Sequence, residues 1–477
     1  MTENAASITD LYRPLDEAEV GRKHWLTVLT AGMGFFTDAY DLFIIGTVTV
    51  ILTPIFRLNT NQISLLNSIS LLASVLGALT FGKLMDRLGR KKVYGLEVAL
   101  LAVGAILTAF SWNFTSLFIF RILVGIGVGG DYATSAVITS EYANKKSRGR
   151  LVGTVFAMQG FGLMAGPAIA AIFLGAGVPN GIAWRLMLGL GAVPALSVVY
   201  LRRKIRETPR YTLSVRGDVA ETTKTVEWVT GEVSAANGQA TTGNGHRPAP
   251  VAATSDLRKR LTSKPYLLRL IGTAGSWFLM DIAFYGNSVS SPLILKQLQP
   301  RGSLLSHTLI SLAIFTVAAV PGYWVAVWLM DRLGRKRIQW QGFLVMALAF
   351  GGIWLIPGAV KNTALFLGLF AISYFFIEFG PNETTFVFPS EIFPTSIRGM
   401  GDGISAAGGK FGAFLGALFV PHLLKSVGIS GVMGMMAAVS AVGILLTLVA
   451  LPEPKGQTLE EASAEIEPAG VPAAAAV

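Results

Sequence analysis

The chain has 477 residues, of which 52% are hydrophobic and only 14% charged, whereas soluble domains usually carry about 25% charged residues, so an ordinary soluble protein is excluded. The chain contains no cysteine, which excludes disulfides, thiolate metal sites and cysteine nucleophiles. The net charge of +11 could suit a nucleic-acid-binding protein, but the basic residues cluster between apolar runs, as in the loops of membrane proteins, so no nucleic-acid partner is predicted.

A polar N-terminal tail, 1–24, precedes the first of twelve apolar segments, each long enough to cross a bilayer, which takes roughly 20 residues. This tail lacks the apolar core of a signal peptide, so we expect the first helix to direct its own insertion. Six segments occupy residues 25–201, at Trp25–Leu52, Ile63–Met85, Val93–Phe110, Ser116–Ser140, Leu151–Leu174 and Trp184–Leu201.

A polar connection, 202–264, separates these segments from the next six. It contains the low-complexity stretch Gly238–Pro250, for which we expect disorder. Six further segments occupy residues 265–451, at Tyr266–Leu295, Leu304–Met330, Ile338–Pro357, Thr363–Phe388, Ile404–Leu424 and Val432–Leu451, and a tail, 452–477, follows. The sequence therefore predicts an all-α membrane protein with twelve transmembrane helices in two six-helix halves.

Lys and Arg are distributed unevenly between the connections. The connections after the second, fourth, sixth and eighth segments are basic, and the one after the sixth begins with Arg202, Arg203 and Lys204. Connections on the opposite side carry few basic residues. The positive-inside rule then predicts that both termini are cytoplasmic, and we expect a multi-pass protein of the plasma membrane.

Two motifs recur in the two halves at nearly one spacing. Asp86 and Arg90 recur as Asp331 and Arg335, 245 residues later, within Asp-Arg-Leu-Gly-Arg-Lys loops. Glu141 and Arg148 recur as Glu391 and Arg398, 250 residues later. Such a duplication indicates two bundles around a central pathway. We expect the loop aspartates to accept hydrogen bonds at a helix end and to pair with Arg, so that these eight residues bias inward-open against outward-open states.

Acidic residues lie inside the predicted spans, where a charge costs about 2.5–3.5 kcal/mol on insertion scales. Asp38 and Asp41 are three residues apart and share one face of the first helix. They are interpreted as a proton site, the alternative being a helix end near the interface. Arg121 and Asp131 share a face of the fourth segment. A structural ion pair is the alternative for Arg121, whereas Asp131 is expected to bind a proton because burial favours a neutral carboxyl.

Trp277, Asp281 and Tyr285 form an i, i+4, i+8 stripe on the seventh segment. Trp and Tyr alone would indicate packing, but the Asp between them favours a binding site. The indole N–H and the phenol O–H can donate hydrogen bonds to a tetrahedral oxyanion, and the carboxylate can accept one from a protonated phosphate. Sulfate at neutral pH has no proton to donate, so the same Asp would repel it.

Several segments resemble the major facilitator superfamily. They are the loop Gly82–Lys92, Arg121 with the glycines that follow it, Arg206–Arg210 and Pro452–Glu460. A sharper resemblance is to the fungal and plant proton-coupled phosphate symporters, and it is carried by Phe35–Leu42, Gly129–Lys146, Trp277–Tyr285 and Phe379–Asn382.

The resemblance implies roles for named residues. It places Asp38, Asp41, Asp131 and Glu97 in a proton pathway, to which we also assign Arg121. It implies that Tyr132, Gln159 and Asn382 contact the ligand. The stripe on the seventh segment is expected to contact the same ligand. Lys410 is expected to attract the anion or to couple to a carboxylate, with snorkelling to an interface as the alternative. For Glu378 and Glu383, proton relay and helix–helix hydrogen bonding both remain open.

The resulting prediction is a proton-coupled importer of inorganic phosphate that works by alternating access, with phosphate, protons and the bilayer as its partners. The alternatives are a proton-coupled symporter of another small solute, such as an organic acid or a sugar, and a non-transporting nutrient sensor. No catalytic triad, metal cluster or nucleotide-binding loop is recognisable, so neither an enzyme nor a cofactor is predicted. The resemblance implies that a monomer suffices for transport.

Overall fold

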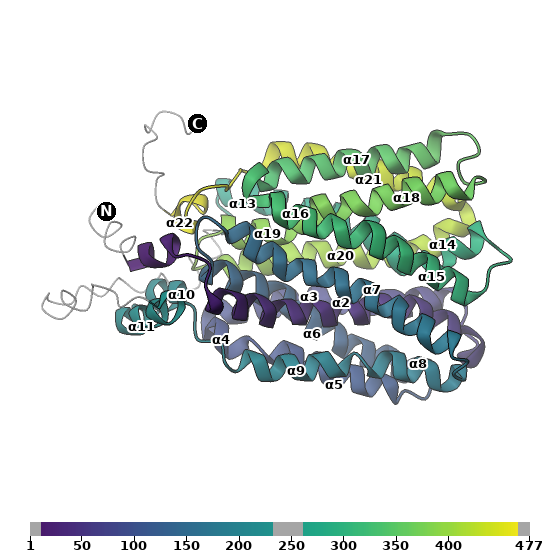
Figure 1. Ribbon diagram of the computed structural model, residues 1–477, viewed down its shortest axis with the longest axis horizontal. Helices are drawn as coiled ribbons and strands as arrows, with labels where there is room; N and C mark the ends of the chain where they lie inside the picture. The colour runs from purple at the N-terminus through teal and green to yellow at the C-terminus, as the bar shows by residue number, and fades with distance from the viewer. Residues whose placement is uncertain (1–10, 232–260, 466–477) are drawn as a thin grey trace, which may run out of the picture.

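The computed structural model describes residues 11–231 and 261–465, and it consists of α-helices joined by short connections (Figure 1). Twelve helices among the described residues are long and apolar enough to cross a membrane, which confirms the predicted number. The stretch Gly238–Pro250, in which disorder was expected, lies outside the described residues.

The first half of the chain forms one group of helices, drawn purple to blue in Figure 1. Its spans are α2 (Arg22–Phe56), α3 (Thr60–Leu88), α4 (Arg90–Val93) with α5 (Leu96–Ala109), α6 (Phe114–Tyr142), α7 (Arg148–Gly175), and α8 (Asn180–Gly189) with α9 (Ala192–Arg202).

The second half forms the green and yellow group. Its helices are α13 (Lys264–Val289), the short α14 (Ser291–Leu298), α15 (Leu304–Ile314) continued by η2 (Phe315–Ala319) and α16 (Val320–Leu333), α17 (Arg335–Leu355), α18 (Thr363–Ile377) continued by η3 (Glu378–Asn382) and α19 (Glu383–Ile392), α20 (Arg398–Ser426), and α21 (Gly428–Ala450).

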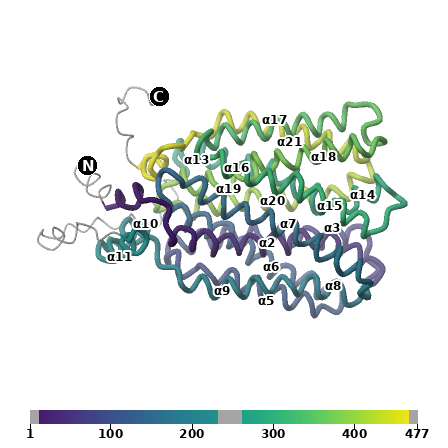
Figure 2. Tube along the Cα trace, viewed as in Figure 1, coloured from purple at the N-terminus to yellow at the C-terminus, as the bar shows by residue number. Residues whose placement is uncertain are grey.

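The predicted connection 202–264 contains two short helices, α10 (Pro209–Ser214) and α11 (Val219–Thr230). Together with α22 (Leu459–Ala462) they lie at one end of the helix bundle, which Figure 2 shows on the left. We call this end of the molecule the tail face.

The two halves meet along two seams. In the α3–α20 seam, α20 packs against α3 and α6, and in the α7–α16 seam, α7 packs against α15, α16 and α19. Glycine permits the close approach in the first seam, because a Cβ at Gly82 would collide with the backbone of Gly399 and Gly403. Small residues are the usual means by which transmembrane helices pack closely.

A break interrupts the tenth span. Gly380 has φ −107° and ψ −111°, outside the helical region, and Pro381 follows it inside the π-helical turn η3. Proline lacks the backbone N–H that would continue the helix, and such π-turns often occur at functional sites. The break determines where Asn382 points.

Candidate functional site

The stripe on α13 meets a lysine from α20. Trp277, Asp281 and Tyr285 are all buried on one side of α13. The Nζ of Lys410 lies 3.3 Å from Oδ2 of Asp281 and donates a 2.9 Å hydrogen bond to the Tyr285 hydroxyl. Gly409 makes this approach possible, because a Cβ there would collide with the Trp277 indole. The lysine is therefore held inside the bundle rather than snorkelling to an interface.

Two residues of the first half join this group. The Tyr132 hydroxyl donates to Oε1 of Gln159 at 2.9 Å and lies 3.1 Å from the Tyr285 hydroxyl. The Nζ of Lys410 is 3.8 Å from the centroid of the Tyr132 ring, in cation–π geometry. Six of the seven predicted ligand residues thus form one cluster between the halves, which we call the central site: Tyr132, Gln159, Trp277, Asp281, Tyr285 and Lys410.

Aromatic rings that the sequence reasoning did not single out surround the central site. Phe35 packs edge-on against Tyr132 with centroids 4.8 Å apart, and Phe43 stacks on Tyr285 at 5.3 Å. Phe386 of the second half contacts both Phe35 and Phe156. These apolar walls hold the phenol groups in position and keep the surroundings of the lysine poor in water.

Asn382 does not join the central site. Its amide nitrogen donates to the Tyr323 hydroxyl at 2.8 Å and to the carboxylate of Glu378. The π-turn directs the Asn382 side chain towards α16, and no periodicity in the sequence signals such a turn. Asn382 therefore lies in a neighbouring polar group with Tyr323 and Glu378.

Three polar atoms of the central site have no hydrogen-bond partner among the described residues. They are Nε1 of Trp277, Nε2 of Gln159 and Oδ1 of Asp281, all buried. Leaving a buried polar group unsatisfied costs about 1–3 kcal/mol. Two free N–H donors, an ammonium group and a free carboxylate oxygen together suit a small oxyanion that still carries a proton.

The predicted proton-pathway residues form three ion pairs, one with Arg121 and two with Arg202, and leave one acid without a partner among the described residues. Arg121 donates to Oδ2 of Asp41 at 2.5 Å. Arg121 therefore pairs with α2, although the sequence had placed it on a shared face with Asp131. Both carboxylate oxygens of Asp38 are buried and lack a partner among the described residues.

Asp131 pairs instead with Arg202, at 2.6 Å, and accepts a 2.5 Å hydrogen bond from Ser135. Arg202 also binds Glu97 at 2.8 Å, so one arginine is shared by two acids. From its sequence context, Arg202 was expected to belong to a basic connection. It is the last residue of α9 and fully buried, and the only signal for this was its position at the very end of an apolar segment.

Asp38 lies beside this group. Gly34, one turn earlier on the same face of α2, faces the Asp131–Arg202 pair so closely that a Cβ would collide with both side chains. The absence of a side chain at Gly34 lets α2 approach α6. Asp38, one turn further along the same face of α2, therefore lies close to the Asp131–Arg202 pair.

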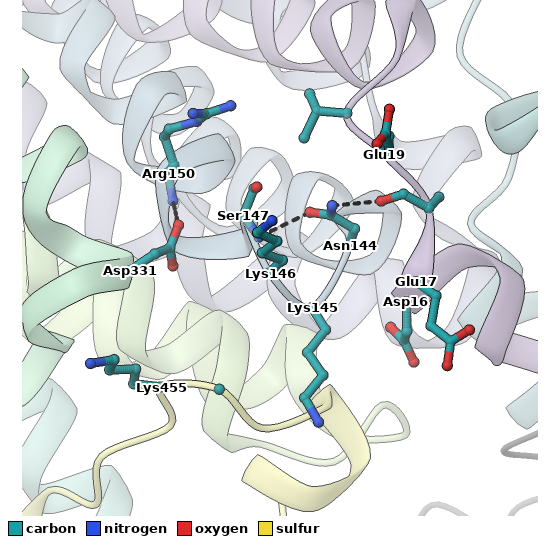
Figure 3. A pocket seen from close by; sticks show the side chains of 13 residues that line it. Asp16, Glu17, Glu19, Asn144, Lys145, Lys146, Ser147, Arg150, Asp331 and Lys455 are labelled. Atoms are coloured by element: carbon teal, nitrogen blue, oxygen red, sulfur yellow. Dashed lines mark hydrogen bonds between the residues drawn. The ribbon is translucent and has the colours of Figure 1, made fainter.

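The repeated loops tie the halves together at the tail face. Asp86 accepts hydrogen bonds from the backbone N–H groups of Gly399 and Met400, at 3.1 and 2.7 Å, and so caps the first turn of α20. Asp331 does the same for α7, accepting from Gly149 at 3.1 Å and from Arg150 at 2.8 Å, the second of which is drawn in Figure 3. Each carboxylate stabilises the positive end of a helix from the opposite half.

The other members of the motifs extend these contacts. Asp86 and Asp331 lie 3.4 and 3.0 Å from Arg90 and Arg335. Glu141 binds Arg90 and Arg398, and Glu391 binds Arg148 and Arg335, at 2.7–3.1 Å. Because Glu141 and Arg398, like Arg148 and Glu391, belong to different halves, the network closes the tail face.

A second set of contacts, not anticipated from the sequence, involves Arg210 of α10. Its guanidinium binds Asp16 at 2.6 Å and Glu460 at 2.9 Å, and it donates to the Glu141 carbonyl at 2.8 Å. Burial opposes ionisation of Glu460, but the charge and the hydrogen bond of Arg210, together with the charge of Arg398 and a backbone hydrogen bond, outweigh burial and leave the pKa of Glu460 below its usual value. Burial raises the pKa of Asp16 despite the same arginine. We call Arg210, Asp16 and Glu460 the tail clasp.

A pocket of about 870 Å³ opens beside the tail clasp. Figure 3 shows Lys145, Lys146 and Arg150 on one side of it and Asp16 and Glu17 on the other. Both signs of charge line this pocket, so it does not select an anion. None of the predicted ligand residues lies in it.

Comparison with known proteins gives one family over nearly the whole chain. The family model described as "Sugar (and other) transporter" matches residues 26–466. The chain is 35% identical to inorganic phosphate transporter 1-6 of Oryza sativa subsp. japonica, over 96% of each chain. It is 34% identical to inorganic phosphate transporter 1-1 of Arabidopsis thaliana, over 95% of this chain and 97% of the relative.

Solved structures share the fold. The proton:xylose symporter XylE bound to 6-bromo-6-deoxy-D-glucose superposes with a TM-score of 0.77 at 20% identity, covering 93% of this chain and 98% of the other. The partially occluded inward-open conformation of XylE from E. coli gives a TM-score of 0.72 at 18% identity, covering 91% and 99%.

Proposed function

Because the chain belongs to the sugar (and other) transporter family, within the major facilitator superfamily, we propose that it imports inorganic phosphate together with protons by alternating access. The full-length similarity to plant proteins named inorganic phosphate transporters supports the substrate class. The structural likeness to a proton:xylose symporter supports the fold alone.

The observation that carries the proposal is the Lys410–Asp281 pair inside the central site. Lys410 supplies the positive charge that a buried anion needs. The free N–H groups of Trp277 and Gln159 can donate to the anion's oxygens. The free Oδ1 of Asp281 accepts a hydrogen bond only from a ligand that retains a proton, as phosphate does at neutral pH and sulfate does not.

The acids of the first half carry the protons in this proposal. Import of one negative charge against about 100 mV costs about 2.3 kcal/mol, so a cation must travel with the anion. Asp41 and Asp131 have arginine partners, but Asp38 has none in the part of the chain that the structure describes. A proton on Asp38 removes an unpaired charge from the bundle interior, and its arrival and departure change the charge beside the central site.

The tail face is the cytoplasmic face in this proposal, the membrane is the plasma membrane, and both termini are cytoplasmic. The motif network joins the halves there and closes the tail face, while the central site is buried between the halves. Rocking of the halves breaks the caps at α7 and α20 and opens the central site to the cytoplasm. The eight motif residues act as gating elements.

Uptake of labelled phosphate into proteoliposomes tests the proposal. We expect uptake to rise at acidic external pH, to stop with a protonophore, and to be inhibited by arsenate but not by sulfate. Asp281→Asn should lose phosphate uptake, whereas Glu17→Gln, the same kind of change at an exposed acid of the tail face, should not. Insensitivity to pH and protonophore would refute proton coupling, and stronger inhibition by succinate or glucose than by phosphate would refute the substrate.

A further inference from the structure

Two acids of the second half take no part in the sites described above. Glu383, the first residue of α19, and Asp402 of α20 are fully buried. Neither carboxylate has a hydrogen-bond partner on either oxygen among the described residues. A charged carboxylate left unpaired in a protein interior costs several kcal/mol, so both groups need an explanation.

Glu383 lies in the α7–α16 seam. Its Oε2 faces Gly153 of α7, where a Cβ would stand 3.3 Å from the oxygen, and the same spot is bordered by Val327 and Met330 of α16. The charged group that acts on Glu383 is another acid, Glu378. The carboxyl therefore lies between the halves, among apolar side chains and without an ion-pair partner among the residues that the structure describes.

Asp402 lies in the α3–α20 seam, one turn after Arg398. The charged groups that act on it are Asp86 of α3 and Arg398. Asp86 is already bound by Arg90 and by the first N–H groups of α20. Arg398 is bound to Glu141 of α6 and to the Phe393 carbonyl. Arg398 is thus already paired with an acid of the other half, and although its Nη2 has no hydrogen-bond partner, it forms no ion pair with Asp402 among the described residues.

Both acids lie between the central site and the network at the tail face. Along α20, Asp402 stands about 12 Å before Lys410 at the 1.5 Å rise of a helix. Glu383 directly follows Asn382 and precedes Glu391 of the network on the same helix. When the tail face opens, these are the stretches of the two seams that come into contact with water.

We propose that Glu383 and Asp402 are proton-binding sites that belong to the closed tail face, one in each seam. Each carboxyl is a neutral acid while its seam is closed, and it releases its proton to water on the tail side when the seam opens. The closed state then binds more protons than the open state, so rising pH favours opening, by about tenfold in the open-to-closed ratio per pH unit for each proton released. The inference rests on the alternating access of the proposed function.

The absence of cysteine allows a direct test with spin labels. Labels at Leu88→Cys on α3 and Arg337→Cys on α17, both exposed at the tail face and in different halves, report the separation of the halves by pulsed electron resonance in nanodiscs. We expect the wide-separation population to grow as pH rises from about 5 to about 9. Glu383→Gln and Asp402→Asn should each flatten this dependence, and the double variant should flatten it most.

Two controls make the result decisive. Glu17→Gln should leave the dependence unchanged, because that acid is exposed. Infrared difference spectra between the two pH values should lose one protonated-carboxyl C=O band in each seam variant. A variant that merely misfolds would not lose that band alone. Seam variants that keep both the band and the wild-type pH dependence would overturn the inference.

The outcome is separable from that of the proposed function, because the spin-label measurement uses no substrate. A pH-independent separation together with protonophore-sensitive phosphate uptake refutes the seam sites alone. A pH-dependent separation together with uptake that ignores the protonophore refutes proton-coupled import and leaves the seam sites standing.

Discussion

The two halves bury an acid in corresponding helices but surround it differently. α13 packs on α20 as α2 packs on α7. In the second half, Asp281 has the ammonium group of Lys410 at 3.3 Å. In the first half, Asp38 has no hydrogen-bond partner within residues 11–231 and 261–465, and Gly160 occupies the position on α7 that corresponds to Lys410 at the 250-residue spacing of the repeat.

The difference separates two tasks that a symporter must perform. An acid beside a lysine stays ionised and helps to define a fixed polar site, whereas an acid without a partner is stable in the interior only when it is protonated. In the proposed function, the halves of an ancestral repeat have thus diverged at one position, into an anion site in the second half and a proton site in the first.

The largest effect is expected for Lys410→Met, which leaves Asp281 buried and unpaired. Removing one partner of a buried charged pair costs about 2–5 kcal/mol, so phosphate affinity should fall by about 30-fold or more. Titration calorimetry or thermal stabilisation by phosphate would measure it. Adding Asp281→Asn should restore the protein's thermal stability but not the affinity, and recovery of both would show that Lys410 acts only as a structural partner.

The next effect concerns the first half. Asp38→Asn fixes the side chain in a neutral form, so the anion moves without its proton. At a membrane potential of about 100 mV the lost driving force is about 2.3 kcal/mol per charge, or about 50-fold in the accumulation ratio. Phosphate exchange between equal concentrations should persist, because the central site is intact. An accumulation ratio that is unchanged in Asp38→Asn would remove Asp38 from the proton pathway.

A smaller difference is expected between the two caps at the tail face. The side chain of Asp86 is 2% exposed and that of Asp331 is 20% exposed, although both accept two backbone hydrogen bonds. Hydrogen bonds to charged groups contribute about 1.5–3 kcal/mol when buried and less in water. Asp86→Asn should therefore open the tail face more than Asp331→Asn, as read from the Leu88–Arg337 label separation. Equal shifts in the label separation would mean that the two caps contribute equally to holding the tail face closed.

Hydropathy and the repeat sufficed to predict the twelve spans and the two halves, because span length and loop charge are local properties. The stripe on α13 was predictable for the same reason, since i, i+4 spacing fixes a helix face. The partner of Arg121 was not, because a shared face within α6 does not say which helix packs against it. The burial of Arg202 was hidden by its place at a helix end, and the position of Asn382 by a π-turn that leaves no periodic signal.

The tail clasp links a segment before the first half to a segment after the second. Changes to it are expected to have the smallest effect. Arg210 binds Asp16, which precedes the first half, and Glu460, which follows the second. The pKa of Glu460 is lowered, so its contribution to docking of α22 is present above its usual value of about 4.5 and is lost as pH falls through the lowered pKa. The pKa of Asp16 is raised by burial, so its ionisation opposes docking as pH rises from about 3.8.

These two dependences partly cancel in the intact protein, and the net effect should stay below that of one charged hydrogen bond, about 1.5–3 kcal/mol. Asp16→Asn removes the opposing contribution. The mobility of a spin label at Ala464→Cys, an exposed position just after α22, should then rise more steeply below about pH 4.5 than in the parent protein. Glu460→Gln should abolish this rise in label mobility at low pH, both in the parent protein and in the Asp16→Asn variant. If Asp16→Asn leaves the profile unchanged, Arg210 is neutralised by the second half alone, and the clasp does not connect the two ends of the chain.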